Sequence, residues 1–175
     1  PFLSVFDPPE SGEGSIDPLS LMATYENLAE RIYPYITVRM ARPRFLTAMV
    51  VGAASGIGRA SAAGLDAFGA HVVCADLDSE GAAQTVSSLQ KEGGDAKAVS
   101  INICDTESIR SGLIDAGPVD ILVSTPSINV RKPILDITDD EFDRVVDVNL
   151  KGTFRLVRET ARGMAERGKG SIIVF

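Results

Sequence analysis

Residues 52–58 form a glycine-rich loop whose spacing can serve phosphate chemistry. The loop reads Gly-Ala-Ala-Ser-Gly-Ile-Gly and lies between an apolar run and a helical pattern. Gly52 allows a sharp turn off a buried strand, Gly56 lets backbone N–H groups approach a pyrophosphate, and Gly58 lets the next helix pack closely on a sheet. Free N–H groups and the positive end of the helix dipole then favour an anion. A glycine-rich turn can equally be only a turn, so the flanking segments decide its meaning.

A carboxylate, Asp76, follows the next apolar run at about 20 residues beyond the loop. An acid at this spacing can accept hydrogen bonds from both ribose hydroxyls of NAD, and its charge repels the 2′-phosphate of NADP. No Arg or Lys stands in the loop or directly after Asp76. The spacing therefore predicts NAD in preference to NADP, and the alternative is a solvated acid at the end of a strand.

The elements that must position these residues lie on both sides of the loop. From residue 46 onward, apolar runs alternate with helical patterns, as in a Rossmann-like, doubly wound parallel sheet of the α/β class. Asn149 and Gly152 interrupt the last helical pattern, so we expect a bend or a division there. Strands are expected near residues 46–51, 71–75, 97–101, 119–124 and 171–175. Helices are expected near residues 57–68, 79–92, 106–115 and 139–167.

Polar residues mark where these helices begin. Asp78 and Thr106 are expected to cap the second and third helices. Thr138 and Glu141 have the spacing of a capping box on the fourth helix.

The composition indicates an ordinary globular chain. Hydrophobic residues make up 45% of the 175 residues and charged residues 23%. No apolar run reaches the roughly 20 residues that cross a membrane, and no signal-peptide pattern is visible, so we expect a cytoplasmic protein without a membrane partner. Residues 1–30 hold six acids and no Lys or Arg, which leaves the rest of the chain nearly neutral. No basic face is available for nucleic acid.

Neither the cysteines nor the histidine suggest a further site. Cys74 and Cys104 lack the spacing of zinc ligands or of a redox pair, so we expect buried free thiols and no metal site. His71 opens the second strand pattern with no acid–base partners near it in sequence, and we expect a structural role.

Residues 1–45 differ from the rest of the chain. Residues 1–17 combine prolines with Ser, Gly and acids, as in a disordered acidic leader. Residues 18–45 are expected to form a helix near 18–33 and a basic connector, which we interpret as a solvated loop. Residues 46–175 form the expected dinucleotide-binding domain, which is partial.

Taken together, these motifs resemble the short-chain dehydrogenase/reductase family over roughly residues 46–175. The matching features are Gly52, Gly56 and Gly58 in a GxxxGxG arrangement, Asp76 after the second strand, Val119-Asp120-Ile121-Leu122-Val123 as the fourth strand, and Val148-Asn149-Leu150-Lys151-Gly152 in the fourth helix. Their combination in this order is far more specific than any one motif.

The resemblance implies a strand order of 3-2-1-4-5, a homo-oligomer, and hydride transfer between NAD and a small alcohol or ketone. It implies that Asn149 holds a water in a proton relay through its side-chain or backbone carbonyl, as a catalytic residue. The cofactor-binding residues that it implies are Gly52, Ser55, Gly56, Ile57, Gly58, Asp76, Asn102 and Ile103.

The chain also departs from the family's pattern. Ser124-Thr125-Pro126-Ser127 replaces the usual Asn-Asn-Ala-Gly, Val51 replaces a Thr, and Asn102 replaces an Asp. The family's catalytic Tyr-xxx-Lys is absent, and its Ser, Tyr and Lys segment would follow residue 175. The sheet is therefore expected to be incomplete at one edge. We expect the cofactor-binding half of an oxidoreductase that is inactive alone, and the alternative is a non-catalytic nucleotide-binding or interaction module.

Overall fold

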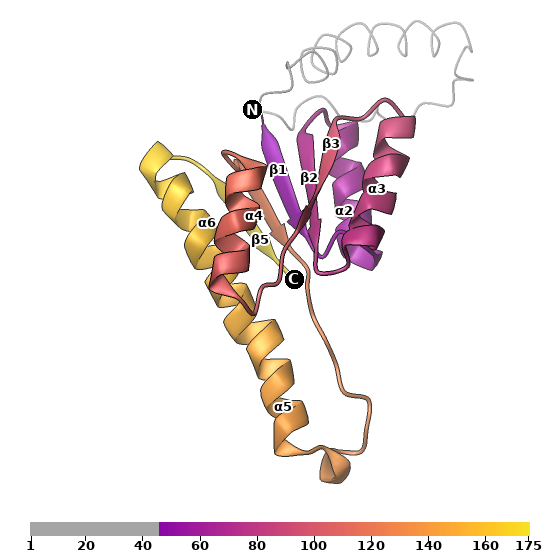
Figure 1. The fold of residues 1–175 in the computed structure, drawn as a ribbon, viewed down its shortest axis with the longest axis vertical. Helices are drawn as coiled ribbons and strands as arrows, with labels where there is room; N and C mark the ends of the chain where they lie inside the picture. Colours follow the sequence, from indigo (N-terminus) through magenta and orange to yellow (C-terminus); the bar gives the residue numbers. More distant parts are fainter. Residues whose placement is uncertain (1–45) are drawn as a thin grey trace, which may run out of the picture. The chain divides into compact units, whose positions relative to one another are not determined.

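The computed structural model describes residues 46–175 (Figure 1), so the expectations for residues 1–45 lie outside the described residues. The strands are β1 (Thr47–Val51), β2 (His71–Asp76), β3 (Ala96–Ser100), β4 (Ile121–Ser124) and β5 (Ser171–Val174). The helices are α2 (Gly56–Ala67), α3 (Ser79–Lys91), α4 (Thr106–Ala116), α5 (Asp139–Val146) and α6 (Thr153–Arg167). A 3₁₀ turn at Ile134–Asp136 precedes α5, and a π turn at Asp147–Gly152 joins α5 to α6.

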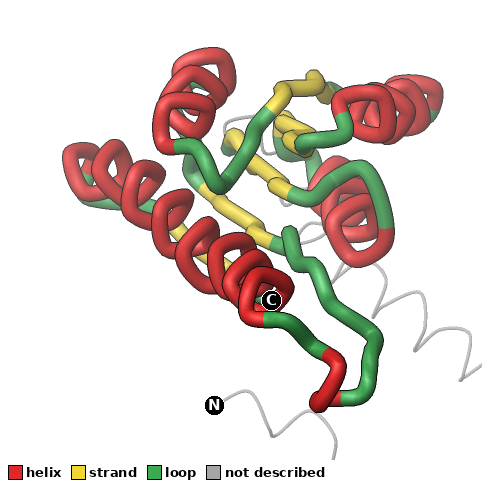
Figure 2. Tube along the Cα trace, turned by 60° about the horizontal axis from the view of Figure 1, so that its bottom comes forward, coloured by secondary structure: helices red, strands yellow, loops and turns green. Residues whose placement is uncertain are grey.

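The strands form one parallel sheet in the order β3-β2-β1-β4-β5, as the sequence predicts. Side chains alternate between two cores because successive residues of a strand point to opposite faces. Met49 and Val51 pack toward α4 and α6, whereas Ala48 and Val50 pack toward α2 and α3. Figure 2 shows the strands lying between helices on both sides. Burial on both faces explains why these strands are almost continuously apolar.

The register of the sheet brings the strand ends together at one edge. Val51 at the end of β1 pairs with Ala75 of β2 and with Ser124 of β4. The segments that follow β1, β2 and β4 therefore begin side by side. This edge is where open α/β sheets bind ligands.

Two of the three predicted helix starts are confirmed and one is wrong. Asp78 accepts a hydrogen bond from the N–H of Gly81 at 3.0 Å, and Thr138 caps α5 through a capping box with Glu141. The N-cap of α4 is Asp105, not Thr106, and its carboxylate accepts from the N–H of Glu107 at 2.9 Å. Both residue types cap helices well, so only the backbone path could distinguish the two.

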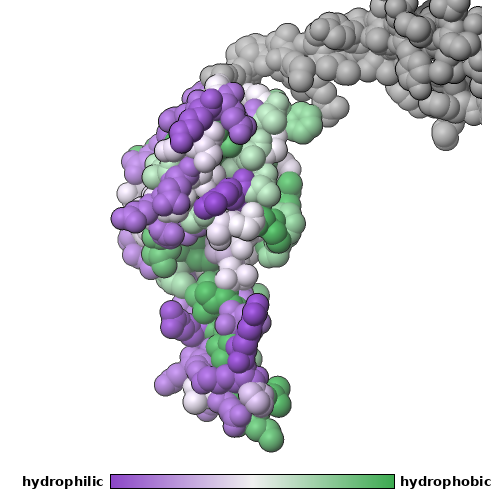
Figure 3. Space-filling model, turned by 90° about the vertical axis from the view of Figure 1, so that its right-hand side faces the viewer, coloured by the Kyte–Doolittle hydropathy of each residue, from purple (hydrophilic) through white to green (hydrophobic). Residues whose placement is uncertain are grey.

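The expected interruption of the last helix is confirmed, and it takes the form of the π turn. The helix continues through this turn, and α5 extends past the sheet (Figure 1). Figure 3 shows hydrophilic and hydrophobic residues mixed on this narrow extension. Within residues 46–175, no helix is long and apolar enough to cross a membrane.

The edge strand β5 is partly uncovered, as expected for an incomplete sheet. Ile173 and Val174 are 46% and 49% exposed. Ile172, the residue before them, packs against the core on the α4 and α6 side. Its neighbours there include Leu122, with which it pairs in register.

Candidate functional site

A cavity of about 480 Å³ opens at the carboxyl edge of the sheet. Its walls come from the loop after β1, the ends of β2 and β3, residues 125–128 after β4, and the helix that begins with α5. The sequence expectations concentrate here. The lining includes all eight residues expected to bind a cofactor: Gly52, Ser55, Gly56, Ile57, Gly58, Asp76, Asn102 and Ile103.

Gly52 and Gly58 leave no room for a side chain. Gly52 has a φ of +88°, and a Cβ there would lie 2.3 Å from the Oγ1 of Thr125. A Cβ at Gly58 would lie 2.1 Å from the backbone oxygen of Gly52. The start of α2 therefore packs directly on the end of β1, with the Thr125 side chain beside both glycines.

Gly56 differs because its surroundings are open. Its φ is +50°, and a Cβ there would meet no described atom within 4 Å. Ser55 is the N-cap of α2, but its side chain makes no capping hydrogen bond. Backbone N–H groups in the first turn of a helix have no partner within the helix, so this turn presents donors toward the cavity. The arrangement can bind an anion.

Asp76 joins the glycine loop to the segment after β2. Its Oδ2 accepts from the N–H of Ala54 at 2.9 Å, and its Oδ1 accepts from the N–H of Asp78 at 3.0 Å. A carboxylate offers about four acceptor positions, so further hydroxyl donors can still bind it. Asp76 can therefore stabilise the loop and face a ligand at the same time.

Asn102 and Ile103 form the wall beyond β3. The Oδ1 of Asn102 accepts from the N–H of Cys104 at 3.0 Å, which closes a tight turn. Cys104 itself lines the cavity and is only half-buried, so the expectation of a buried thiol is wrong there. Burial and a hydrogen bond with Asp147 raise the pKa of the Cys104 thiol. Asp147 in turn accepts from Arg155 at 3.1 Å.

Cys74 and His71 behave as structural residues. Cys74 is fully buried in β2, and burial, with the charge of Asp66, raises the pKa of its thiol to about 11. His71 lies outside the cavity, with its Nδ1 at 3.1 Å from the carboxylate of Asp95. Among residues 46–175, no cluster of three or more potential metal ligands occurs.

Asn149 does not line the cavity, but it holds a segment that does. Its Oδ1 accepts from the N–H of Ile128 and its Nδ2 donates to the oxygen of Ile128, both at 2.9 Å. This pair of bonds anchors Ile128 to the π turn. Pro126 and Ser127, the departures from the family's pattern, line the cavity beside this anchor.

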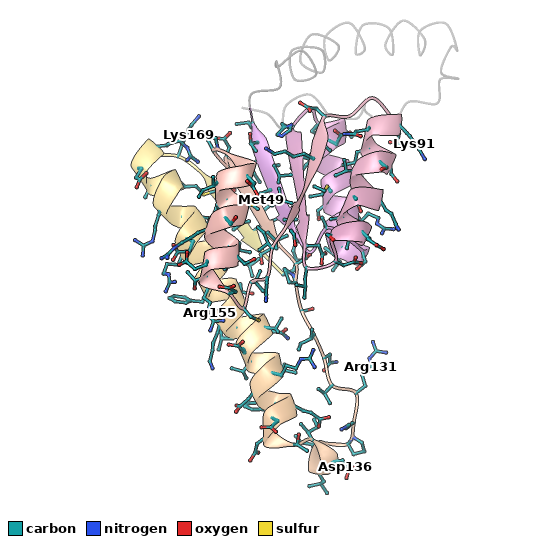
Figure 4. All side chains as sticks on the ribbon, viewed as in Figure 1. Met49, Lys91, Arg131, Asp136, Arg155 and Lys169 are labelled. Carbon is teal, nitrogen blue, oxygen red and sulfur yellow. The ribbon has the colours of Figure 1, made fainter. Side chains whose placement is uncertain are left out.

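The sequence did not single out Arg144 as a residue of this site. Arg144 of α5 lines the cavity together with Val148 in the π turn. The spacing of four residues between them places both on one side of a helix, and this was the available signal. Arg131 and Asp136 do not line the cavity, and Figure 4 shows them near the far end of the segment after β4.

Known proteins with similar sequences and folds support one family. Residues 46–175 match the family model described as short chain dehydrogenase. L-xylulose reductase of Mesocricetus auratus is 36% identical over 132 residues, which are 73% of this chain and 50% of that protein. 5-keto-D-gluconate 5-reductase of Escherichia coli (strain K12) is 32% identical over 129 residues, which are 71% of this chain and 51% of that protein. The chain thus spans about half the length of these curated relatives.

A solved structure extends this similarity to the fold. The gluconate 5-dehydrogenase of Burkholderia cenocepacia J2315, crystallised with NADP and tartrate, matches with a TM-score of 0.70 and 30% identity. The match covers 79% of this chain and 56% of that one.

Proposed function

Since this chain belongs to the short-chain dehydrogenase family, we propose that residues 46–175 are the cofactor-binding part of an oxidoreductase that uses a nicotinamide dinucleotide. The observation that carries the proposal is the start of α2. There Gly52 and Gly58 exclude side chains, Gly56 faces open space, and the first turn has no side-chain cap. A pyrophosphate is the group that such a turn accommodates.

The residues present fit a dinucleotide. The first turn of α2 would hold the pyrophosphate, Asp76 would accept the ribose hydroxyls, and Asn102 with Ile103 would flank the adenine. When bound, the nicotinamide accepts or supplies a hydride. We propose NAD in preference to NADP because the Asp76 carboxylate repels a 2′-phosphate. The related gluconate 5-dehydrogenase was crystallised with NADP, so NADP is the cofactor with which NAD binding must be compared.

Asn149 has a narrower role in this proposal than the sequence suggested. Both polar atoms of its side chain bond the backbone of Ile128, so the role that we propose does not use the side chain. A π turn interrupts the regular hydrogen-bond ladder of a helix and is frequent at functional sites. We therefore propose that the backbone carbonyl of Asn149 orients a water of the proton relay.

The complete reaction requires groups beyond those in this chain. No Tyr is followed by a Lys four residues later, so the sequence lacks the pair that the family uses as acid and base. The proposed substrate is a small polyol or keto sugar, by similarity to the L-xylulose and 5-keto-D-gluconate reductases. The cytoplasmic location stays a prediction.

Titration of the full chain with NAD and NADP tests the proposed function. We expect NAD to bind more tightly, and Asp76→Ala to narrow the difference about tenfold, since it removes the ribose acceptor and the repulsion. Asp136→Ala removes the same charge outside the cavity and should leave the difference unchanged. Equal affinities for the two cofactors would overturn the preference for NAD, whereas no binding of either would overturn the proposed function.

A second candidate function is a nucleotide-binding or interaction module without catalysis. The presence of Pro126 and Ser127 in the cavity wall favours it. Binding of AMP or ADP without binding of NAD would distinguish this module from a dehydrogenase part, because only the nicotinamide half would then be excluded.

We also propose that the chain self-associates. Three large apolar side chains, Phe142, Leu150 and Phe154, are 61%, 67% and 61% exposed along α5, the π turn and α6. Their spacings of eight and four residues are close to whole helical turns, so they share one side. Leu150→Lys should shift the sedimentation of the full chain toward the monomer. An unchanged distribution would contradict this interface.

A further inference from the structure

Two side chains outside the cavity hold the peptide groups that lead into α2. The hydroxyl of Thr85, in α3, lies 2.8 Å from the backbone oxygen of Ala53. Arg59 of α2 donates from Nε to the Thr85 hydroxyl at 3.2 Å and from Nη2 to the backbone oxygen of Ala54. Thr85 is only 1% exposed, and neither side chain lines the cavity. The backbone carbonyls of Ala53 and Ala54, which precede α2, are therefore both held by side chains that do not line the cavity.

The direction of each bond follows from the donors available. A hydroxyl has one hydrogen, and the Thr85 hydroxyl lies closer to the oxygen of Ala53 than to that of Gly81, which is at 3.2 Å. It therefore donates to Ala53 and accepts from Arg59. The bonds run in one sequence, from Arg59 through Thr85 to the glycine loop.

The planarity of the peptide carries this restraint to the N–H groups. In a trans peptide, the C=O and the following N–H point in opposite directions. The C=O of Ala53 points to Thr85, and the N–H of Ala54 accordingly points the other way, to Asp76 at 2.9 Å. By the same geometry, the bond from Arg59 to the oxygen of Ala54 turns the N–H of Ser55 away from Arg59. Ser55 lines the cavity.

The place of Arg59 in its helix supports a functional reason for these bonds. Arg59 is the fourth residue of α2, near the positive end of the helix dipole, where a cation is unfavourable. Its two hydrogen bonds to Thr85 and Ala54 offset this cost. Its charge also adds to the positive potential that a bound anion would meet.

We propose that Arg59 and Thr85 are positioning residues for a diphosphate, which act by fixing the backbone of residues 53–55 so that the N–H groups at the start of α2 are aligned before binding. This inference rests on the proposed function. A positioning role predicts weaker binding of the diphosphate and unchanged binding of adenosine, whereas a general contribution to the fold would affect both.

The test compares ADP with adenosine on the full chain. Thr85→Val keeps the side-chain shape without the hydroxyl, and Arg59→Met keeps length without donors. Each should weaken ADP binding about tenfold, as expected for lost hydrogen bonds around a charged ligand, and change adenosine binding less than about twofold. Thr85→Ser restores the hydroxyl and should bind ADP as the wild type does. Unchanged ADP binding in both variants, or an equal loss of adenosine, would overturn the proposal.

A second measurement is independent of any ligand. Hydrogen exchange of the amides of residues 53–58 should be faster in Thr85→Val and Arg59→Met than in Thr85→Ser, by a larger factor than exchange of the amides of α4, which reports any overall loss of stability. If the wild type binds neither ADP nor NAD, the proposed function fails, and this comparison still decides the positioning role. Equal exchange in all variants would overturn it.

Discussion

The loop after β1 and the segment after β4 begin side by side at the same edge of the sheet, but they are held differently. In the first loop, the N–H groups of Gly52 and Ala53 donate to Ala75, the N–H of Ala54 donates to Asp76, and side chains of α2 and α3 hold two carbonyls. The segment after β4 is anchored at Thr125, by its bonds to Val51, and at Ile128, by Asn149.

The loop after β1 and the segment after β4 also differ in the exposure of their apolar side chains. Ile134 and Leu135, beyond the second anchor, are 83% and 94% exposed. Ala53, within the first loop, is fully buried. A phosphate site depends on aligned backbone donors and gains from such fixed geometry. Beyond the anchor at Ile128 the segment after β4 is therefore the more exposed of the two, whereas its residues 125–128, which line the cavity, lie between the two anchors.

The largest expected effect is that the chain binds NAD but does not catalyse hydride transfer. The chain of 175 residues should bind NAD through the first loop, yet show no NADH turnover with a panel of ketones and keto sugars. Positioned acid–base catalysis is worth about 100- to 10,000-fold, and the Tyr-xxx-Lys pair is absent. Turnover above the buffer rate, followed by absorbance, would contradict this expectation.

A substitution at Gly58 should break the first loop. Because a Cβ would lie 2.1 Å from the backbone oxygen of Gly52, Gly58→Ala should cost about 3 kcal/mol in the free energy of unfolding. It should also weaken NAD binding about 100-fold. Gly64→Ala is the matched control, since Gly64 is exposed in the same helix with nothing within 4 Å of a Cβ. Similar urea midpoints for the two variants would show that close packing at Gly58 is not needed.

The buried thiol of Cys74, in β2, predicts that the free energy of unfolding depends on pH. The pKa of Cys74 is raised from 9.0 to about 11 in the folded state. The unfolded thiol loses its proton first, so the stabilisation is complete below pH 9 and is lost as the pH rises toward 11. We expect a loss of about 2 to 3 kcal/mol over this range, measured by urea unfolding.

The two cysteines supply the comparison for this effect. Cys74→Ala should remove most of the additional loss of stability at high pH, whereas Cys104→Ala should retain it because Cys104 is less buried. A wild-type slope equal to that of Cys74→Ala would mean that the thiol does not titrate with unfolding.

The smallest effect concerns the anchor of the segment after β4. Asn149→Ala removes two hydrogen bonds to Ile128 and should cost about 2 kcal/mol in the free energy of unfolding. Asn129→Ala, at an exposed site in the same segment, should change stability by less than about 0.5 kcal/mol. If both variants unfold at the same urea concentration, the segment does not depend on this anchor.

The sequence alone predicted the class of the fold, the strand order through the family resemblance, and eight residues that line the cavity. These features depend on local patterns, because apolar runs define buried strands and the spacing of Gly52, Gly56 and Gly58 follows from the sterics of one turn. The interruption near Asn149 was predictable for the same reason.

The contacts that hold this turn in place could not be predicted from the sequence. Thr85 lies 32 residues from Ala53, and Asn149 lies 21 residues from Ile128, so no local pattern could pair them. The choice of Asp105 over Thr106 as a cap, and the exposure of Cys104 to the cavity, likewise depend on the path of the backbone after β3. Hydrogen bonds between distant segments depend on where the sheet places their donors and acceptors, and sequence spacing carries no record of that distance.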